Sequence, residues 1–255
     1  MILVGTMKAG KMHSINNVVI ITAEESGARI QQLFSRADLQ VTTINSKTSD
    51  ADELAAADIA IEAIGEEGLR KKILHRCDER LRPEAILSTT VVSGMTELSA
   101  FTRRPQRFVG LHFTFNPFQD SCLVQIVKSL ETSDETLEIC TNLMEKTGAT
   151  TIQVVDSPGL VLDRTMALTI NEAATMYVTK VATIEDIDRI AKSCLNWPLG
   201  PFEFADVIGV DNVLATLETL AQEIGPQFLP CRLLKQMVAT GRRGKATGRG
   251  FYIYH

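Results

Sequence analysis

The chain has 255 residues, of which 45% are apolar and 22% charged, and its formal net charge is −5. This length supports one large domain or two smaller ones, each with a sizeable core. The acidic balance argues against nucleic acid or an anionic membrane surface as a partner, because both select basic patches. No apolar run approaches the roughly twenty residues that span a bilayer, so no membrane partner is expected.

The cysteine pattern is typical of reduced thiols in a cytoplasmic protein, because the five residues are scattered and none forms a Cys-x-x-Cys pair. No histidine lies near a cysteine at ligand spacing, so we predict no metal site. The five are Cys77, Cys122, Cys140, Cys194 and Cys231.

The first 157 residues alternate short β-branched runs with amphipathic stretches. A helix is predicted over Gly27–Ala37, with Ile30, Leu33 and Phe34 on one face, and a charged helix over Glu66–Arg80. Strands that alternate with helices predict an α/β domain of the Rossmann-like, doubly wound class with a parallel sheet. The strands are predicted at Asn17–Thr22, Leu39–Asn45, Ile59–Ile64, Ala85–Thr89, Phe108–His112 and Thr151–Val155.

The pattern changes after residue 157, and we predict an all-helical C-terminal domain over residues 158–255. Leu160–Tyr177 has helical periodicity, and Thr183 with Asp186 is typical of a capping box that opens the next helix. Further helices are predicted over Asn212–Glu223 and Cys231–Ala239. The basic, glycine-rich segment 241–250 is either a solvated turn, which we favour, or a phosphate contact.

Several runs in this order resemble one enzyme family. Gly110–Pro117 contains His112 and Asn116 in the pattern Gly-x-His-Phe-(x)-Asn-Pro, and Ser157-Pro158-Gly159 follows about forty residues later. The later runs are Pro198-Leu199-Gly200-Pro201-Phe202-Glu203 and Gly248-Arg249-Gly250-Phe251-Tyr252. Together they resemble the 3-hydroxyacyl-CoA dehydrogenase family, which includes the 3-hydroxybutyryl-CoA dehydrogenases.

The resemblance implies an NAD-dependent oxidoreductase of fatty acid metabolism, acting on a 3-hydroxyacyl-CoA or a small 3-hydroxy acid. It also implies a homodimer formed through the C-terminal domain. His112 would be the catalytic base and Asn116 would position the substrate oxygen, while Gln125 takes the place of the residue that orients the histidine. The remaining assignments are Gly27, Asn45, Glu66 and Lys71 for the cofactor and Thr89, Thr90 and Asp163 for the substrate.

The chain departs from the family pattern at places that matter for chemistry. Thr22–Gly27 aligns with the Gly-x-Gly-x-x-Gly loop that brings backbone close to the pyrophosphate, and only Gly27 is kept. The acidic residue that should hold the ribose is Asn45. The glutamate that should stabilise a protonated histidine is Gln125. The substrate-contacting serine falls at Val91, with hydroxyls next to it at Thr89 and Thr90.

These departures leave three hypotheses. The first is the dehydrogenase activity that the resemblance implies. The second is a catalytically degenerate relative, a pseudoenzyme that acts as an acyl-CoA-binding or regulatory partner protein. The third is an enzyme on the same scaffold that uses another cofactor or carries out non-redox acyl-CoA chemistry. The binding of NAD and turnover of an acyl-CoA separate them.

Overall fold

The computed structural model describes residues 15–23, 26–46, 51–90, 94–115 and 120–254. The chain divides into two compact units, one ending at Asp156 and the other beginning at Ser157. We call them the sheet unit and the helical unit and describe each by itself. Within the described residues, no helix has the length and apolar character needed to cross a bilayer.

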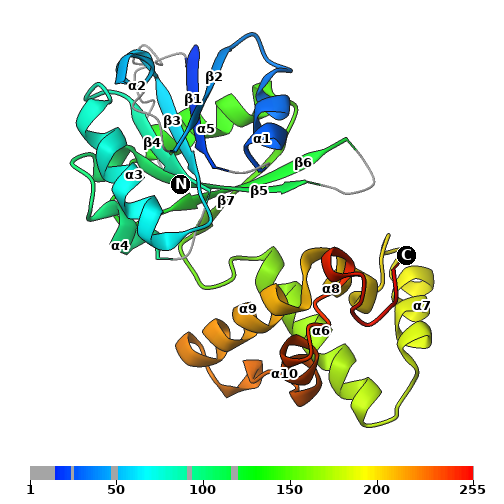
Figure 1. Ribbon diagram of the computed structural model, residues 1–255. Coiled ribbons are helices and arrows are strands. Elements are labelled where there is room, and N and C mark those ends of the chain that lie inside the picture. The colour runs from blue at the N-terminus through cyan, green and yellow to red at the C-terminus, as the bar shows by residue number, and fades with distance from the viewer. Residues whose placement is uncertain (1–14, 24–25, 47–50, 91–93, 116–119, 255) are drawn as a thin grey trace, which may run out of the picture. The chain divides into compact units, whose positions relative to one another are not determined.

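The sheet unit is built around a seven-stranded sheet in the order β2-β1-β3-β4-β5-β6-β7 (Figure 1). Its helices connect successive strands. The strands are β1 (Asn17–Thr22), β2 (Gln40–Asn45), β3 (Ile59–Ala63), β4 (Ile86–Thr89), β5 (Phe108–Phe115), β6 (Cys122–Lys128) and β7 (Thr150–Val155). The helices are α1 (Ser26–Phe34), α2 (Ala51–Ala56), α3 (Glu67–Arg80), α4 (Met95–Ser99) and α5 (Asp134–Lys146), with a 3-10 turn at Pro105–Arg107.

The first five strands are parallel, whereas β6 pairs antiparallel with β5 and β7 pairs parallel with β6. The link from Phe115 to Cys122 is too short for a crossover, which needs about a dozen residues, so the chain must return antiparallel. The doubly wound α/β class is confirmed. The predicted strand set contained β7 but lacked β6, and the reversed direction of these two strands corrects the expected all-parallel sheet.

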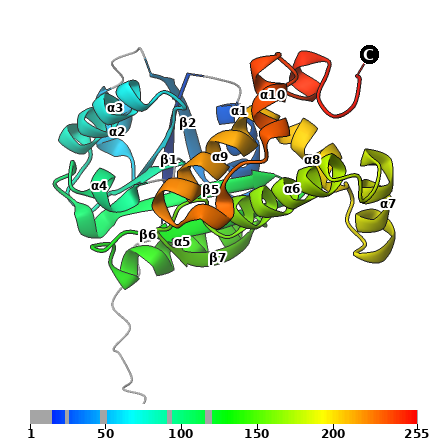
Figure 2. The ribbon, with the colours of Figure 1, turned by 90° about the horizontal axis from the view of Figure 1, so that it is seen from below.

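Helices cover the two faces of the sheet. On one face, α1 and α5 pack with the side chains of Val18, Ile20, Ile61 and their neighbours in one buried cluster. Ile30, Leu33 and Phe34 of α1 lie in this cluster, as predicted, and each large apolar side chain buried there contributes about 1.5–3 kcal/mol. The other face is covered by α2, which contacts β1, and by α3, which contacts β3 and β4 (Figures 1 and 2).

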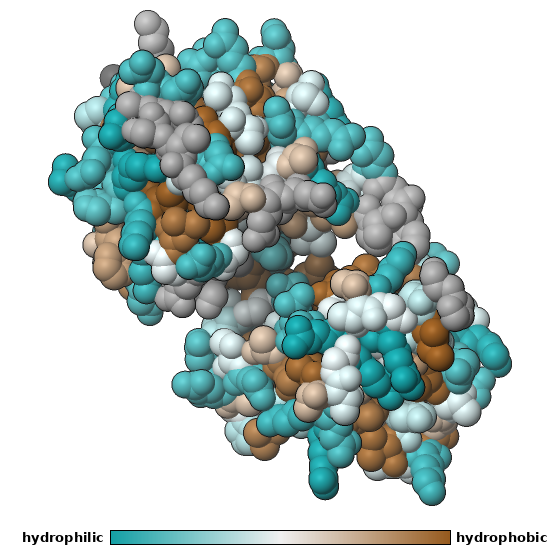
Figure 3. Space-filling model, viewed as in Figure 1, coloured by the Kyte–Doolittle hydropathy of each residue, from teal (hydrophilic) through white to brown (hydrophobic). Residues whose placement is uncertain are grey.

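The helical unit packs around α6 and α9. Phe202 is fully buried, and its ring centroid lies 4.4 Å from that of Phe251. Apolar residues also reach the surface of this unit, where brown side chains stand among teal ones in Figure 3. The helices are α6 (Leu162–Val178), α7 (Ile184–Cys194), α8 (Pro201–Ile208), α9 (Val210–Glu223) and α10 (Arg232–Ala239), with 3-10 turns at Pro226–Phe228 and Lys245–Thr247.

The predicted cap of α7 is confirmed. The Thr183 hydroxyl accepts a hydrogen bond from the Asp186 N–H at 3.2 Å and donates to the Asp186 carboxylate at 3.0 Å. The basic segment after α10 is a tight turn in which the Arg242 guanidinium donates to the Gly250 carbonyl at 2.8 and 3.2 Å. This contact favours the turn over a phosphate contact for Arg242.

Two buried aspartates explain the motifs at residues 198–203 and 248–252. Asp188 accepts the N–H groups of Phe202 and Glu203 at 2.9 and 3.0 Å and the Tyr252 hydroxyl at 2.8 Å. Burial is the largest influence on the Asp188 carboxyl and raises its pKa. A Cβ at Gly200 would lie 2.2 Å from Asp188 Cγ, so only glycine allows the chain to approach this carboxylate.

Asp206 binds the backbone of the second motif, residues 248–252, in the same way. It is 1% exposed and accepts the N–H groups of Phe251 and Tyr252, both at 2.9 Å, and the Tyr254 hydroxyl at 3.0 Å. A Cβ at Gly250 would lie 1.9 Å from Asp206 Oδ1. Both motifs therefore stabilise the fold of the helical unit.

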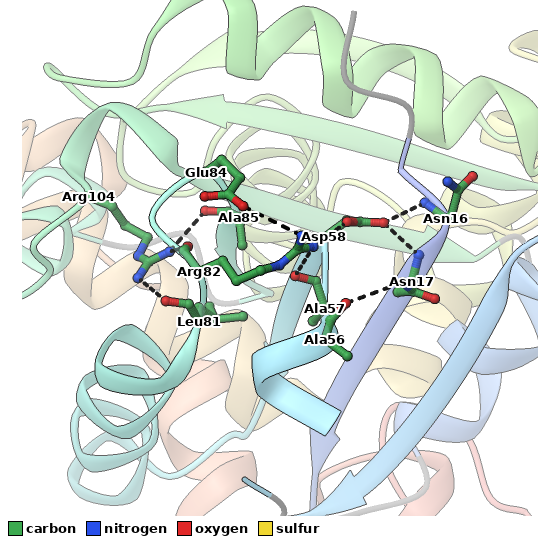
Figure 4. A network of polar contacts seen from close by, with 10 residues as sticks. All are labelled: Asn16, Asn17, Ala56, Ala57, Asp58, Leu81, Arg82, Glu84, Ala85 and Arg104. Atoms are coloured by element: carbon green, nitrogen blue, oxygen red, sulfur yellow. Dashed lines mark hydrogen bonds and ion pairs between the residues drawn. The ribbon is translucent and has the colours of Figure 1, made fainter. Parts of the chain in front are cut away.

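A third carboxylate organises the edge of the sheet where the parallel strands begin (Figure 4). Asp58 accepts the N–H groups of Asn16 and Asn17 at 2.8 and 2.9 Å and the guanidinium of Arg82 at 2.6 Å. Partial burial opposes ionisation, but the Asn17 and Asn16 donors and Arg82 together lower the pKa of Asp58. The contact fixes the start of β1 against the start of β3.

We predict that Asp206→Asn destabilises the helical unit by about 2–3 kcal/mol, because an amide nitrogen would face a buried N–H donor. Asp211→Asn is the matched control, since that side chain is half-exposed and lies 3.9 Å from Arg243. Denaturant unfolding followed by the fluorescence of Trp197, the single tryptophan, measures both. Equal stability of the two variants would contradict the role given to Asp206.

Candidate functional site

The candidate site lies at the edge of the sheet where the parallel strands end. From β1 the chain passes through α1 to β2 on one side, and it then returns through α2 to β3 on the other side. This reversal makes the ends of β1 and β3 a topological switch point, where open α/β sheets bind ligands. Thr22 and Ala63 are the paired residues at that point.

Gly27 packs the first helix onto the first strand. A Cβ at this position would lie 2.4 Å from Thr22 Cγ2 and 2.7 Å from Thr22 Cβ. The Thr22 side chain is buried, 8% exposed. It is therefore the side chain at Thr22, where the family loop has its first glycine, that makes glycine necessary at 27. Glu24, which aligns with the second glycine, lies outside the described residues.

Asn45 ends β2 beside Thr22, its register partner on β1, and its side chain is exposed. Ser46 follows, with its N–H donating to the Thr22 carbonyl at 3.1 Å. The Ser46 side chain is 3% exposed, and its hydroxyl has no hydrogen-bond partner among the described residues. Among the residues that the structure describes there, the place that holds a ribose in dinucleotide folds thus offers an amide and a hydroxyl but no carboxylate.

Glu66 and Lys71 lie on the far side of the switch point. Glu66 precedes the first residue of α3, and its carbonyl accepts the N–H of Arg70 at 2.9 Å. The Lys71 ammonium lies 5.8 Å from the ring centroid of Phe101. Both predicted cofactor residues are exposed at the start of one helix, which follows directly from the end of β3.

A buried ion pair that sequence reasoning missed lies beneath them. Glu62 is fully buried, and Arg70 is 7% exposed with its Nε 3.7 Å from Glu62 Oε2. Burial is the largest influence on Glu62 and raises the pKa of its carboxyl, against the donors Thr89 and Ile64 and the charge of Arg70. The available signal was the lone acidic residue inside the apolar run Ile59–Ile64.

The two predicted substrate hydroxyls have different surroundings. Thr89 is fully buried, and its hydroxyl donates to Glu62 Oε2 at 2.6 Å. Thr90 is half-buried just beyond β4, and its N–H donates to the Glu62 carbonyl at 2.8 Å. The exposure favours Thr90 over Thr89 as the one that meets a ligand. Val91 lies outside the described residues.

His112 and Gln125 face each other across the β5–β6 hairpin. They are register partners, so their Cβ atoms are expected to be about 4.5–5.5 Å apart. His112 is half-buried and Gln125 is fully buried. The structure therefore brings the predicted base and its predicted orienting residue together. Asn116, the third predicted catalytic residue, lies outside the described residues.

The strand alternation places His112 on the face that α3 covers. Leu111 and Phe113, its neighbours along β5, belong to the core of the α1 and α5 face. Ile61 and Ala63 belong to the same core. Because successive side chains point to opposite faces, Glu62 and His112 share the other face. The registers Glu62 to Thr89 and Thr89 to Gly110 place His112 two residues further toward the carboxyl edge.

The hairpin that carries His112 is tied to α1. The Arg29 guanidinium lies 4.4 Å from the ring centroid of Phe115, and Arg36 forms an ion pair with Asp120.

Asp163 is exposed in the first turn of α6 and belongs to the helical unit. Among the described residues, no group of three His, Cys, Asp or Glu side chains is arranged to hold a metal ion.

Two family models match the chain in succession. The 3-hydroxyacyl-CoA dehydrogenase NAD-binding domain matches residues 22–157, and the C-terminal domain of the same family matches residues 159–254. The chain belongs to the 3-hydroxyacyl-CoA dehydrogenase family. The resemblance read from the sequence is confirmed, and NAD is the cofactor that the matched domain binds.

Named relatives agree with this family. The chain is 38% identical over 233 residues to the "Probable 3-hydroxybutyryl-CoA dehydrogenase" of Bacillus subtilis (strain 168), covering 89% of this chain and 81% of the relative. It is 36% identical to the 3-hydroxybutyryl-CoA dehydrogenase of Bradyrhizobium diazoefficiens, covering 80% and 70%. The crystal structure of (S)-3-hydroxybutyryl-CoA dehydrogenase PaaH1 from Ralstonia eutropha superposes with a TM-score of 0.89 at 32% identity, covering 95% and 100%.

The described residues fit a dinucleotide on the ribose side of the switch point. Asn45 offers an exposed amide at the ribose position, and α1 has no acidic residue in its own first turn. Ser46 adds a buried hydroxyl without a partner in this part of the chain, the kind of group that a ligand oxygen satisfies. The misfit is Thr22, whose side chain occupies a glycine position of the loop.

We predict that Asn45→Asp strengthens NADH binding and weakens NADPH binding, each by about tenfold, equivalent to 1.4 kcal/mol. A carboxylate accepts hydrogen bonds from both ribose hydroxyls of NADH but repels the 2′-phosphate of NADPH. Gln40→Glu, at the exposed opposite end of β2, adds the same charge away from the site. Fluorescence titration measures the dissociation constants of NADH and NADPH. Equal changes of their ratio in Asn45→Asp and Gln40→Glu would contradict the placement of Asn45.

Proposed function

We propose that this chain catalyses an NAD-dependent interconversion of a hydroxy compound and its 3-oxo product. The substrate is a 3-hydroxyacyl-CoA with a short acyl chain, or a small 3-hydroxy acid. The observation that carries the proposal is the pairing of His112 with Gln125 across the β5–β6 hairpin, toward the same edge of the sheet as the switch point. The named relatives, which are 3-hydroxybutyryl-CoA dehydrogenases, support the choice of substrate.

The residues divide into those that hold the ligands and one that moves a proton. NAD, when bound, accepts the hydride that leaves C3 of the substrate. His112 takes the proton of the C3 hydroxyl, so the C–H and O–H bonds break while the C=O bond forms. Gln125 fixes the orientation of the imidazole, and Asn116 and Thr90 bind the substrate oxygens. Asn45, Glu66 and Lys71 hold the two ends of the cofactor, with Gly27 supporting the loop between them.

A second candidate function is supported by one observation. Gln125 is uncharged and fully buried, so the residue facing His112 supplies no charge to stabilise an imidazolium. A relative that binds acyl-CoA without turning it over would keep the fold and lose this charge. The two functions differ in one measurable respect, because only the first consumes NADH.

We also propose the arrangement of the chain in the cell. Residues 1–157 act as the dinucleotide-binding domain and residues 158–255 as the substrate and dimerisation domain of a cytoplasmic homodimer. Exposed apolar side chains on the helical unit, including Val178, Val181 and Ile190, support self-association, because exposed apolar surface is typical of interaction sites. The five free thiols support a reducing compartment.

The direct test is NADH oxidation with acetoacetyl-CoA, followed at the NADH absorbance. We expect turnover by the wild type and a loss of about a hundred- to ten-thousand-fold in His112→Ala, the range for a general base. His75→Ala is the control, because His75 is exposed on α3 and pairs only weakly with Glu79 at 3.9 Å. Binding of acetoacetyl-CoA by calorimetry without NADH oxidation would support the second function.

A second variant tests what the amide at position 125 costs. We predict that Gln125→Glu raises kcat by about tenfold, because a carboxylate stabilises the imidazolium that forms as His112 takes its proton. The same substitution in a His112→Ala background should give no gain. A gain in both backgrounds would show that position 125 acts independently of His112.

A further inference from the structure

The loop that follows β3 is held by side chains rather than by the sheet. Beyond Ala63 the backbone leaves the ladder, so its polar groups need other partners. The Ile64 N–H donates to Glu62 Oε1 at 2.6 Å. The Arg70 guanidinium donates to the Ile64 carbonyl at 3.2 and 3.3 Å and to the Gly65 carbonyl at 2.9 Å.

The same carboxylate reaches the neighbouring strand. Glu62 Oε2 accepts the Thr89 hydroxyl at 2.6 Å and lies 3.7 Å from Arg70 Nε. One fully buried carboxylate thus joins the loop after β3, the end of β4 and the first turn of α3. The hydrogen bonds of the Glu62 carboxylate offset the cost of its burial, because a buried charge without hydrogen bonds would cost several kcal/mol.

The residues on either side of this network are the ones assigned to the two ligands. The loop leads directly into Glu66 and the start of α3, which carries Lys71 on the cofactor side. Thr89 leads directly into Thr90 on the substrate side. A shift of the network would change the separation between these two sets of residues.

We propose that Glu62 and Arg70 are positioning residues that set the distance between the nicotinamide end of the cofactor and the acyl-CoA, resting on the proposed dehydrogenase function. Neither touches a ligand. They act by fixing the peptide units of Ile64 and Gly65 against the end of β4. A displacement of about 1 Å between reacting groups costs about a hundredfold in rate, so this separation matters for hydride transfer.

The chain contains a matched comparison pair. Asp78 is 4% exposed, accepts Arg104 Nε at 2.7 Å, and accepts the Arg103 N–H at 2.7 Å. Arg104 also donates to the Leu81 carbonyl at 3.0 Å, on the edge of the sheet where the strands begin (Figure 4). This second buried carboxylate–arginine pair lies in the same unit but at the end of α3 away from the proposed site.

The experiment compares Glu62→Gln and Arg70→Met with Asp78→Asn in the full chain. We expect all three to lower thermal stability, and only the first two to lower kcat, by about ten- to a hundredfold. The kinetic isotope effect with NADH deuterated at C4 should increase in the Glu62 and Arg70 variants alone, because hydride transfer becomes slower relative to other steps. The two substitutions combined should cost no more than the larger single one, since they break one network.

Other outcomes would overturn the proposal. Kinetic parameters and isotope effects of Glu62→Gln equal to those of Asp78→Asn would leave Glu62 a purely structural residue. If Glu62→Gln does not fold, Arg70→Lys provides the same test, because a single ammonium cannot reproduce the guanidinium contacts to both carbonyls. Absence of turnover in the wild type would refute the dehydrogenase function itself; NADH affinity in Glu62→Gln, compared with that in Asp78→Asn, would then decide whether the network orders the cofactor side.

Discussion

The structure of the candidate site depends on one constraint, the need of backbone groups to find partners where a parallel sheet ends. Each strand stops at the same edge, and the next peptide units are no longer held by the ladder. Ser46 solves this by donating to the Thr22 carbonyl, and Ile64 by donating to the buried carboxylate of Glu62. These bonds hold the first peptide units beyond β2 and β3, next to the proposed cofactor residues Asn45 and Glu66. The order of this edge therefore follows from the hydrogen bonding of its backbone, independently of ligand binding.

The reversed hairpin adds to this edge what a purely parallel sheet lacks. Parallel neighbours are joined by long crossovers, so two residues that face each other across strands are far apart in sequence. The antiparallel return of β6 instead places Gln125 opposite His112, only thirteen positions along the chain. Because Leu111 and Phe113 anchor β5 in the core, the direction of the imidazole is set by apolar packing on the opposite face. Packing and chemistry therefore use alternate residues of one strand.

Local patterns predicted the elements whose causes are local. The bounds of β1, the buried face of α1 and the cap at Thr183 follow from β-branched runs, helical spacing and hydroxyl chemistry within a few residues. The strand β6 was missed although its own run, Cys122–Lys128, is rich in apolar and β-branched residues. Glu62 was missed for a different reason, since only the tertiary structure brings Thr89 and Arg70 to it. The residues around His112 were found through a family motif, and their geometry needed the register of the hairpin.

The motifs that identify the family differ in what they do for the molecule. Gly200 and Gly250 exist because Asp188 and Asp206 leave no room for a Cβ, and these carboxylates bind backbone N–H groups within the helical unit. That arrangement stabilises a fold whatever the sheet unit does. Gly27, by contrast, is required by the side chain of Thr22, which replaces a loop glycine. Likeness in the helical unit therefore carries information about architecture. We expect the chemistry of this chain to depend instead on Thr22, Asn45 and Gln125, where the side chain differs in charge or shape from the family pattern.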